Sequence, residues 1–339
     1  MRRQRGYSLI ELMVASTVGL LLLAAMLFVF TGSRQGSRQT EAMARTQENA
    51  RIAVELLSAE IRMAGLAGCR SRGTGGGKEG EIEIRVADLP FTAADLHKPV
   101  LGTVYRAGVP AFVDDGELRG VAGSHVLTLR KSLPSMLALA DDFSAAAGNL
   151  QLRDRDARAD LRDGDLLLVD DCVRSQLVRA RNVSAPDGGG VRHIEVDALP
   201  SVLPYIFSSA AFAEVTALRE EAYFVRASGR RNSAGRPQYA LFRMRDGAVE
   251  EVVDGVSNLR VRYALGDDGA VEAFVHGEEM DEADWKRVLA VRVELLLEAD
   301  AANVLPDPVA VEFDGEPLAA STDLRSVVQF TVALRNRAR

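Results

Sequence analysis

The sequence Gly6-Tyr7-Ser8-Leu9-Ile10-Glu11 opens the stretch that decides how this chain folds, and an uncharged apolar run over residues 12–30 follows it. A helix of that length measures about 28 Å, close to the thickness of the hydrocarbon core of a bilayer. Glu11 lies at the start of the run. A carboxylate costs about 2.5–3.5 kcal/mol at the centre of a membrane helix and less near its end, so its presence here requires an explanation.

The residues around the apolar run allow two interpretations. Arg2, Arg3 and Arg5 form a basic leader, which an ordinary secretory signal peptide or signal anchor also has. Such a signal ends its apolar region with a small-residue cleavage site, and residues 28–32 (Phe-Val-Phe-Thr-Gly) do not form one. The order of basic leader, Gly6, aromatic residue, Ser-Leu-Ile-Glu-Leu and apolar run instead resembles a type IV prepilin signal.

This resemblance has specific implications for the N-terminus. It implies that the leader is cut between Gly6 and Tyr7, that the new N-terminus is methylated, and that the apolar run stays in the mature protein. Tyr7 stands where the family usually has Phe, which leaves the extent of methylation open. The resemblance also implies that Glu11 pairs with the positive N-terminus of a neighbouring subunit in a filament. The same carboxylate would then be costly in lipid and neutralised in the assembly.

The orientation of the chain in the membrane follows from its leader. Basic residues favour the cytoplasmic side, so Arg2, Arg3 and Arg5 are expected there. Arg34 and Arg38, on the other side of the run, weaken this argument slightly. We expect a single-pass inner-membrane protein with its C-terminal domain in the periplasm. The resemblance implies that it later joins an extracellular pilus.

Helical structure is expected to continue past the membrane. Residues 39–64 contain neither Pro nor Gly, and apolar side chains recur there at intervals of three and four, with charged residues opposite. The apolar face comprises Ile52, Ala53, Leu56, Leu57, Ile61, Met63, Ala64 and Leu66. One helix from Tyr7 to Ala64 would be about 87 Å long. Gly32 and Gly36 are its weakest points, because each costs about 1 kcal/mol relative to Ala.

The rest of the chain has the pattern of a β-rich domain. Strict alternation of polar and apolar residues, typical of strands, occurs over residues 81–86, 125–130 and 258–263. Further strands are expected over 165–169, 192–196, 222–225, 239–244, 290–297 and 327–334, and short helices near 93–98 and 281–287. The predicted fold class is α+β, a long N-terminal helix followed by a β-rich globular domain.

We therefore predict five parts in the chain. They are a leader (1–6), a membrane and filament-core helix (7–30), its amphipathic continuation (31–65), a Gly-rich joint (66–80) and a β-rich periplasmic domain (81–339). A division of that domain near residues 197–212 is an open alternative.

Charge and cysteine content narrow the class of protein. The net charge of −7 becomes −10 when the three leader arginines are removed, which argues against a general nucleic-acid binder. Cys69 and Cys172 are the two cysteines. In an oxidising compartment they are expected to form a disulfide, worth about 4–5 kcal/mol for a loop of about a hundred residues. Two buried free thiols are the alternative.

No pattern in the sequence points to catalysis, a cofactor or a metal. The four histidines (His97, His125, His193 and His276) lack ligand spacing. Glu220-Glu221 and Glu278-Glu279 are interpreted as surface carboxylates, and Trp285 as a core residue. Nucleophile-elbow and zinc-protease motifs are absent from the sequence. We expect a protein that is not an enzyme, with a periplasmic enzyme on a signal anchor as the remote alternative.

Later segments narrow the resemblance to the PilW-type minor pilins. The matching segments are residues 45–69, 164–172, 254–263, 285–293 and 331–337, which run through most of the chain in order. Residues 87–120 and 198–220 match nothing recognisable. The resemblance implies a minor pilin that is processed by prepilin peptidase, helps to initiate assembly of a type IV pilus and lies at or near its tip.

The same resemblance implies a set of partners and leaves two rivals open. The partners are other minor pilins, the major pilin, a tip adhesin, the inner-membrane assembly platform and the prepilin peptidase. One rival is the J-type minor pseudopilin of a type II secretion system. The other is an adhesin or ligand-binding module that the pilus presents.

Overall fold

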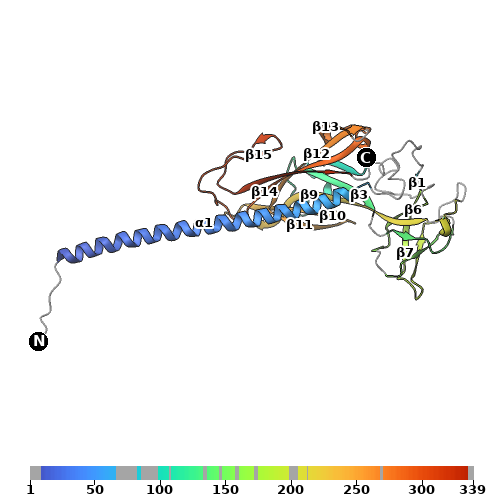
Figure 1. Ribbon diagram of the computed structural model, residues 1–339, viewed down its shortest axis with the longest axis horizontal. Helices are drawn as coiled ribbons and strands as arrows, with labels where there is room; N and C mark the ends of the chain where they lie inside the picture. Colours follow the sequence, from blue (N-terminus) through green and yellow to red (C-terminus); the bar gives the residue numbers. More distant parts are fainter. Residues whose placement is uncertain are drawn as a thin grey trace.

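One long helix leads into a strand-rich domain (Figure 1). This computed structural model describes residues 9–65, 82–84, 98–106, 108–132, 136–144, 147–156, 160–171, 175–197, 205–211, 213–267 and 270–334. The arrangement confirms the predicted α+β fold class. The predicted Gly-rich joint (66–80) and most of the short helix expected near 93–98 lie outside the described residues.

The domain is built mainly from strands, with a few single 3₁₀ turns. The elements are α1 (Leu9–Met63), β1 (Ile82–Ile84), β2 (Val100–Val104), η3 (Ala111–Val113), β3 (His125–Ser132), β4 (Leu137–Ala138), β5 (Asn149–Arg153), β6 (Leu166–Asp170), β7 (Ser175–Val183), β8 (Val191–Val196), η5 (Ser209–Ala211), β9 (Glu214–Arg231), β10 (Pro237–Arg245), β11 (Ala248–Asp254), β12 (Val256–Asp267), β13 (Ala270–His276), η6 (Gly277–Glu279), η7 (Asp284–Arg287), β14 (Val288–Glu298), β15 (Glu312–Phe313), β16 (Glu316–Pro317) and β17 (Arg325–Ala333).

The helix α1 is continuous over 55 residues, or about 83 Å. It passes through Gly32 and Gly36 without interruption, and open space surrounds both glycines. Its buried residues all lie in the C-terminal half, at steps of three and four: Ala42, Thr46, Ala50, Ala53, Leu57 and Ile61. The helix ends at Met63, and the next residues join the sheet, since the Gly65 N–H donates to the Arg130 carbonyl at 2.9 Å.

Two sheets make up the body of the domain. The larger runs β11-β10-β9-β6-β7-β8-β5, with β3 and β4 also paired to β9, β2 to β3, and β1 to β7. The smaller runs β13-β12-β14-β17. The main core is formed where α1 packs between them. Leu57 and Ile61 of the helix belong to the same buried cluster as Leu129 of the larger sheet and Val261 of the smaller one.

A second core lies in what we call the distal lobe, formed by β4–β8 and the first part of β9. It lies beyond the C-terminal end of α1 (Figure 1). Its buried residues include Phe143, Leu152 and Phe207. The strand β9 belongs to both regions, because its residues 214–218 pair with β6 in the lobe and residues 221–231 pair with β10 beside the main core.

Every strand expected from the sequence has a counterpart, but several elements differ. The segment 222–225 is part of the 18-residue β9, and 281–287 forms only the 3₁₀ turn η7. Ile52, expected on the apolar face of the helix, is 40% exposed. Glu221, interpreted as a surface carboxylate, is fully buried. Trp285 is buried, as predicted.

Candidate assembly site

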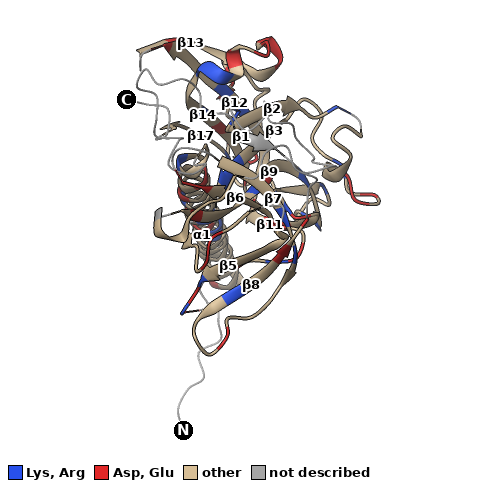
Figure 2. Ribbon diagram, turned by 90° about the vertical axis from the view of Figure 1, so that its right-hand side faces the viewer, with Lys and Arg blue, Asp and Glu red and all other residues tan. Residues whose placement is uncertain are grey.

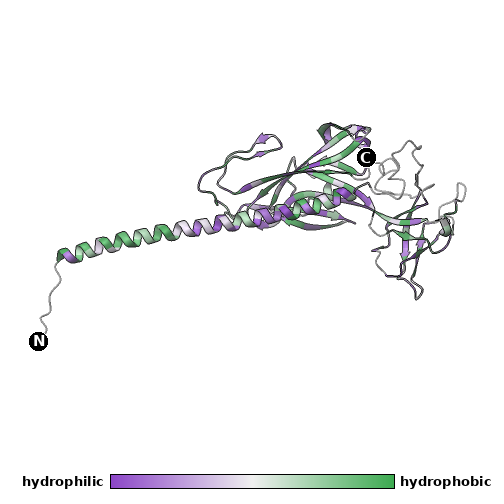
Figure 3. Cartoon of the chain, in the orientation of Figure 1, coloured by the Kyte–Doolittle hydropathy of each residue, from purple (hydrophilic) through white to green (hydrophobic). Residues whose placement is uncertain are grey.

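The N-terminal half of α1 is an apolar rod that the rest of the described chain leaves uncovered. Between Leu9 and Phe30 its large apolar side chains are from 50% exposed at Val18 to 81% exposed at Phe28. Figure 3 shows this half as a nearly continuous hydrophobic stretch, which gives way to mixed character where the helix meets the domain. By length and composition the helix can cross a membrane.

Polar side chains inside the rod bond to the rod itself. The Ser16 hydroxyl donates to the Leu12 carbonyl at 2.8 Å, and the Thr31 hydroxyl donates to the Leu27 carbonyl at 2.9 Å. Thr17 donates to the Met13 carbonyl in the same way. These hydroxyls therefore need neither water nor a partner, which allows the rod to enter lipid or a dry protein interface.

Glu11 is the acidic residue of the first described turn of α1, and it is exposed. A carboxylate here is favoured by the positive end of the helix dipole. Gly6 and Tyr7, the predicted cleavage and methylation residues, lie outside the described residues, as do Cys69 and Cys172. The structure therefore places Glu11 on the rod and leaves the other predicted site residues as predictions.

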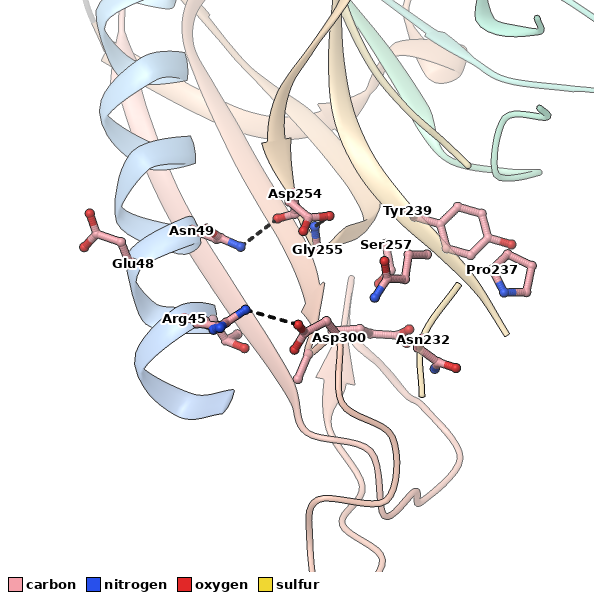
Figure 4. A pocket seen from close by; sticks show the side chains of 14 residues that line it. Arg45, Glu48, Asn49, Asn232, Pro237, Tyr239, Asp254, Gly255, Ser257 and Asp300 are labelled. Carbon is pink, nitrogen blue, oxygen red and sulfur yellow. Dashed lines mark hydrogen bonds and ion pairs between the residues drawn. The ribbon is translucent and has the colours of Figure 1, made fainter. Parts of the chain in front are cut away.

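Hydrogen bonds and ion pairs fix the second half of α1 to the domain. The Gln35 side chain donates to the Val304 carbonyl at 2.7 Å, and the Asn49 side chain donates to the Asp254 carbonyl at 3.1 Å. Figure 4 shows Asn49 and Arg45 reaching from the helix toward the strands. This row of contacts marks where the free rod ends and the docked helix begins.

A pocket of about 320 Å³ lies beside these contacts. It is rich in carboxylates, because Asp254, Glu298 and Asp300 line it, with Arg45 as the basic side chain 3.3 Å from Asp300 (Figure 4). Burial raises the pKa of the Glu298 carboxyl above its ordinary value, and the nearby Arg325 and Arg236 only partly offset this. The pocket therefore lies between the helix and the domain, and burial disfavours the ionised form of its Glu298.

A buried ionic cluster holds the C-terminal end of the helix. Lys131 of β3 pairs with Glu60 of α1 and lies 3.1 Å from Glu221 of β9, which also receives Arg245 of β10 at 2.5 Å and the Tyr223 hydroxyl at 3.0 Å. Burial raises the pKa of Glu221, but Lys131 and Arg245 outweigh it and hold that pKa below its ordinary value. This cluster has no separate signal in the sequence, since charges on strands usually face water.

Outside the rod, charge is distributed without a dominant sign. Figure 2 shows Lys and Arg interspersed with Asp and Glu along the strands and loops. Many of these charges pair with one another, as Arg230 does with Glu251 and Asp254, each at 2.6 Å.

Two known protein families match this chain, one at its N-terminal end and one toward its C-terminal end. Residues 1–27 match the family described as the prokaryotic N-terminal methylation motif, and residues 222–336 match the family described as type IV pilus-assembly protein W. The first match covers the leader and the start of the rod. The second covers most of β9 and everything from β10 to β17. A search of curated proteins finds no match to this chain.

Proposed function

We propose, from the premise that this chain matches a PilW-type pilin with a prepilin signal, that it is a minor pilin of a type IV pilus and helps to initiate pilus assembly. The observation that carries the proposal is the division of α1 into an uncovered apolar rod and a docked half. The chain then acts as a structural subunit and not as an enzyme.

The physical argument starts from the exposed side chains of the rod. Covering one large apolar side chain is worth about 1.5–3 kcal/mol, and more than a dozen such side chains are exposed between Leu9 and Phe30. Lipid covers them while the subunit waits in the membrane, and neighbouring rods cover them in a filament. Glu11 is costly in the first setting and is neutralised in the second by the N-terminal amine of another subunit. This difference favours extraction from lipid and sets the axial register.

The further parts of the proposal concern processing, place and partners. Prepilin peptidase cuts between Gly6 and Tyr7, and the domain lies in the periplasm until the subunit enters the filament at or near its tip. The partners are other minor pilins, the major pilin, a tip adhesin and the inner-membrane assembly platform. The match over residues 222–336 supports a pilus role over that of a J-type pseudopilin.

The test is complementation of a deletion strain with two single variants of the same helix. Glu11→Ala is expected to accumulate in the membrane, to be processed normally and to restore few pili. Glu41→Ala, which removes an exposed carboxylate from the docked half, is the matched control and is expected to restore piliation fully. Equal piliation by both variants would contradict the role of Glu11.

A third variant tests processing and separates the rival. Gly6→Ala is expected to keep its leader, to remain in the membrane and to leave the strain without pili. Normal piliation by the uncleaved protein would overturn the proposal. If the deletion instead abolishes secretion of folded proteins and leaves pili unchanged, the chain is a pseudopilin of the secretion system.

A further inference from the structure

Two histidines that are far apart in the sequence meet where the two sheets come together. His125 begins β3 of the larger sheet, and His276 ends β13 of the smaller one. Glu278 follows in the turn η6. One ligand atom from each of these three residues lies within 4.8 Å of the other two. This cluster could not be predicted from the sequence, because 151 positions separate the two histidines and the packing of the sheets brings them together.

His125 is held in a fixed orientation by the neighbouring sheet. It is buried, and its Nδ1 lies 3.0 Å from the Val261 nitrogen and 3.1 Å from the Val261 oxygen. In the tautomer in which Nδ1 carries the proton and donates it to the Val261 carbonyl oxygen, Nε2 keeps its lone pair for a metal ligand bond. A backbone group that fixes the second ring nitrogen is the usual support of a metal-binding histidine.

The two imidazole rings are spaced as they would be around one ion. Their centroids are 5.4 Å apart and their planes cross at 79°. Two imidazoles on one tetrahedral zinc have centroids about 5 Å apart, because each Zn–N bond is about 2.0–2.1 Å. Neighbouring ligand atoms around such an ion are about 3.4 Å apart, so the cluster must tighten. His125 is buried and fixed in the core, whereas Glu278 is exposed and its side chain is not held by that core.

The charges around the cluster are balanced. Asp314 pairs with Arg260 at 3.2 Å and with Arg262 at 2.7 Å, and its carboxylate lies 3.7 Å from Nε2 of His276. Nδ1 of His276 is buried and faces the backbone N–H of Glu279 in η6, without a hydrogen bond of normal geometry. An imidazole between a carboxylate and an open ligand position is a common arrangement at zinc sites.

The surrounding backbone holds the three residues in place. A Cβ on Gly277 would lie 2.9 Å from the Gly102 carbonyl oxygen, and a Cβ on Gly102 would collide with the Tyr263 hydroxyl. Only glycine permits η6 to lie this close to β2 and β12. The segment that carries His276 and Glu278 is thus pressed against the strands next to His125.

We propose that His125, His276 and Glu278 form a binding site for a zinc-class divalent cation that joins the two sheets. Imidazole nitrogen with one carboxylate oxygen is a donor set that zinc accepts, whereas calcium and magnesium prefer oxygen ligands alone. The bound ion links β3 to the end of β13, and water or a further ligand completes its coordination. The site is independent of the proposed role in pili.

The test uses the full-length mature protein in detergent, stripped of metal with a chelator. After dialysis against Zn²⁺, metal analysis is expected to find one equivalent per chain, and Zn²⁺ is expected to raise the unfolding temperature. His276→Ala and Glu278→Gln are each expected to weaken binding at least tenfold. His193→Ala is the matched control, because His193 is a half-exposed histidine outside the cluster, and it is expected to bind as the unaltered protein does.

Several results would overturn the site. They are no retained Zn²⁺ in the unaltered protein, undiminished binding by both variants, or loss of binding in the His193→Ala control. Binding of Ca²⁺ that survives His276→Ala would equally count against it. If His276→Ala fails to fold, Glu278→Gln decides the question, since Glu278 is exposed and contributes nothing to the core.

Discussion

Single buried charges decide how firmly the helix is held. Glu221 is fully buried and is tolerated because Lys131 and Arg245 surround it. Removing one partner of a buried pair costs several kcal/mol, since the other charge stays in a medium that solvates it poorly. The cluster also contains Glu60, so it links the end of α1 to the larger sheet in addition to the apolar contacts of Leu57 and Ile61.

Lys131→Met is therefore expected to destabilise the domain by about 3–5 kcal/mol. The substitution keeps the volume and leaves Glu60 and Glu221 facing each other with less compensation. Urea unfolding of the mature protein, followed by fluorescence of its single buried tryptophan, Trp285, measures the change. The exposed Lys286→Met serves as control and should shift stability by less than about 0.5 kcal/mol. Equal effects would show that the buried charge carries no special weight.

A second prediction concerns pH and the pocket beside the helix. Burial raises the pKa of Glu298 in the folded protein, so its ionised form costs stability at neutral pH, and the cost disappears as pH falls below the pKa of the unfolded chain. Glu298→Gln is expected to stabilise the protein at pH 7 by on the order of 1 kcal/mol. The gain should shrink toward pH 4, and unfolding curves across this range measure it. A gain that grows in acid would contradict the assignment.

At the scale of elements, one face of α1 does the docking. Leu57 is fully buried in the main core, while Ile52, five residues earlier, is 40% exposed. Leu57→Ala is expected to cost about 2–5 kcal/mol, because it opens a cavity between helix and sheets, and to speed hydrogen exchange in the second half of the helix. Ile52→Ala is the matched control and should cost less than about 1 kcal/mol. Similar losses for both would mean that the helix docks by another face.

The sequence predicted those elements well whose residues follow one clear hydrophobic pattern. The rod follows from its apolar run, and β3, β12 and β14 follow from their alternation. The prediction covered only part of β9, because Arg219 and Glu221 interrupt its apolar pattern. Both are nevertheless buried, Arg219 beside Asp165 in the loop before β6 and Glu221 beside Lys131 of β3. The edge strand β13 escaped for the opposite reason, since its first four residues are exposed and give no alternation of burial.

The candidate site divides in the same way. Glu11 and the apolar rod could be predicted directly from the sequence, because a segment that enters lipid must be apolar over a short continuous stretch of chain. The buried ionic cluster around Glu221 and the His125–His276 pair could not be predicted, since each depends on which strands of the two sheets become neighbours. Pairings such as that of β3 with β9, about ninety residues apart, are set by the packing of the whole core.

At the scale of the whole molecule, the predicted disulfide concerns two segments of chain that follow elements of the main core and of the distal lobe. Gly65 bonds to β3, and β6 ends at Asp170, two residues before Cys172. Both β3 and β6 pair with the same strand, β9. Cys69 and Cys172 themselves lie outside the described residues; the predicted bond would link the chain that follows α1 to the chain that follows β6.

Peptide mapping of the mature protein without reduction is expected to recover Cys69 joined to Cys172. Loss of the bond in Cys172→Ala should lower stability by about 2–5 kcal/mol, with Cys69→Ala giving the same value, because each removes the same link. Reaction of both thiols with a maleimide in the folded, unreduced protein would contradict the bond. Unequal losses would point to separate roles in packing.

The strand β9 has a mechanical consequence. It is a single uninterrupted length of peptide that is paired in the distal lobe at one end and beside the helix-bearing core at the other. A pull on the lobe therefore travels as tension along this backbone, and the hydrogen bonds flanking it are loaded in shear along their whole row instead of being unzipped one by one. Force on the lobe therefore reaches the core that holds the docked half of α1.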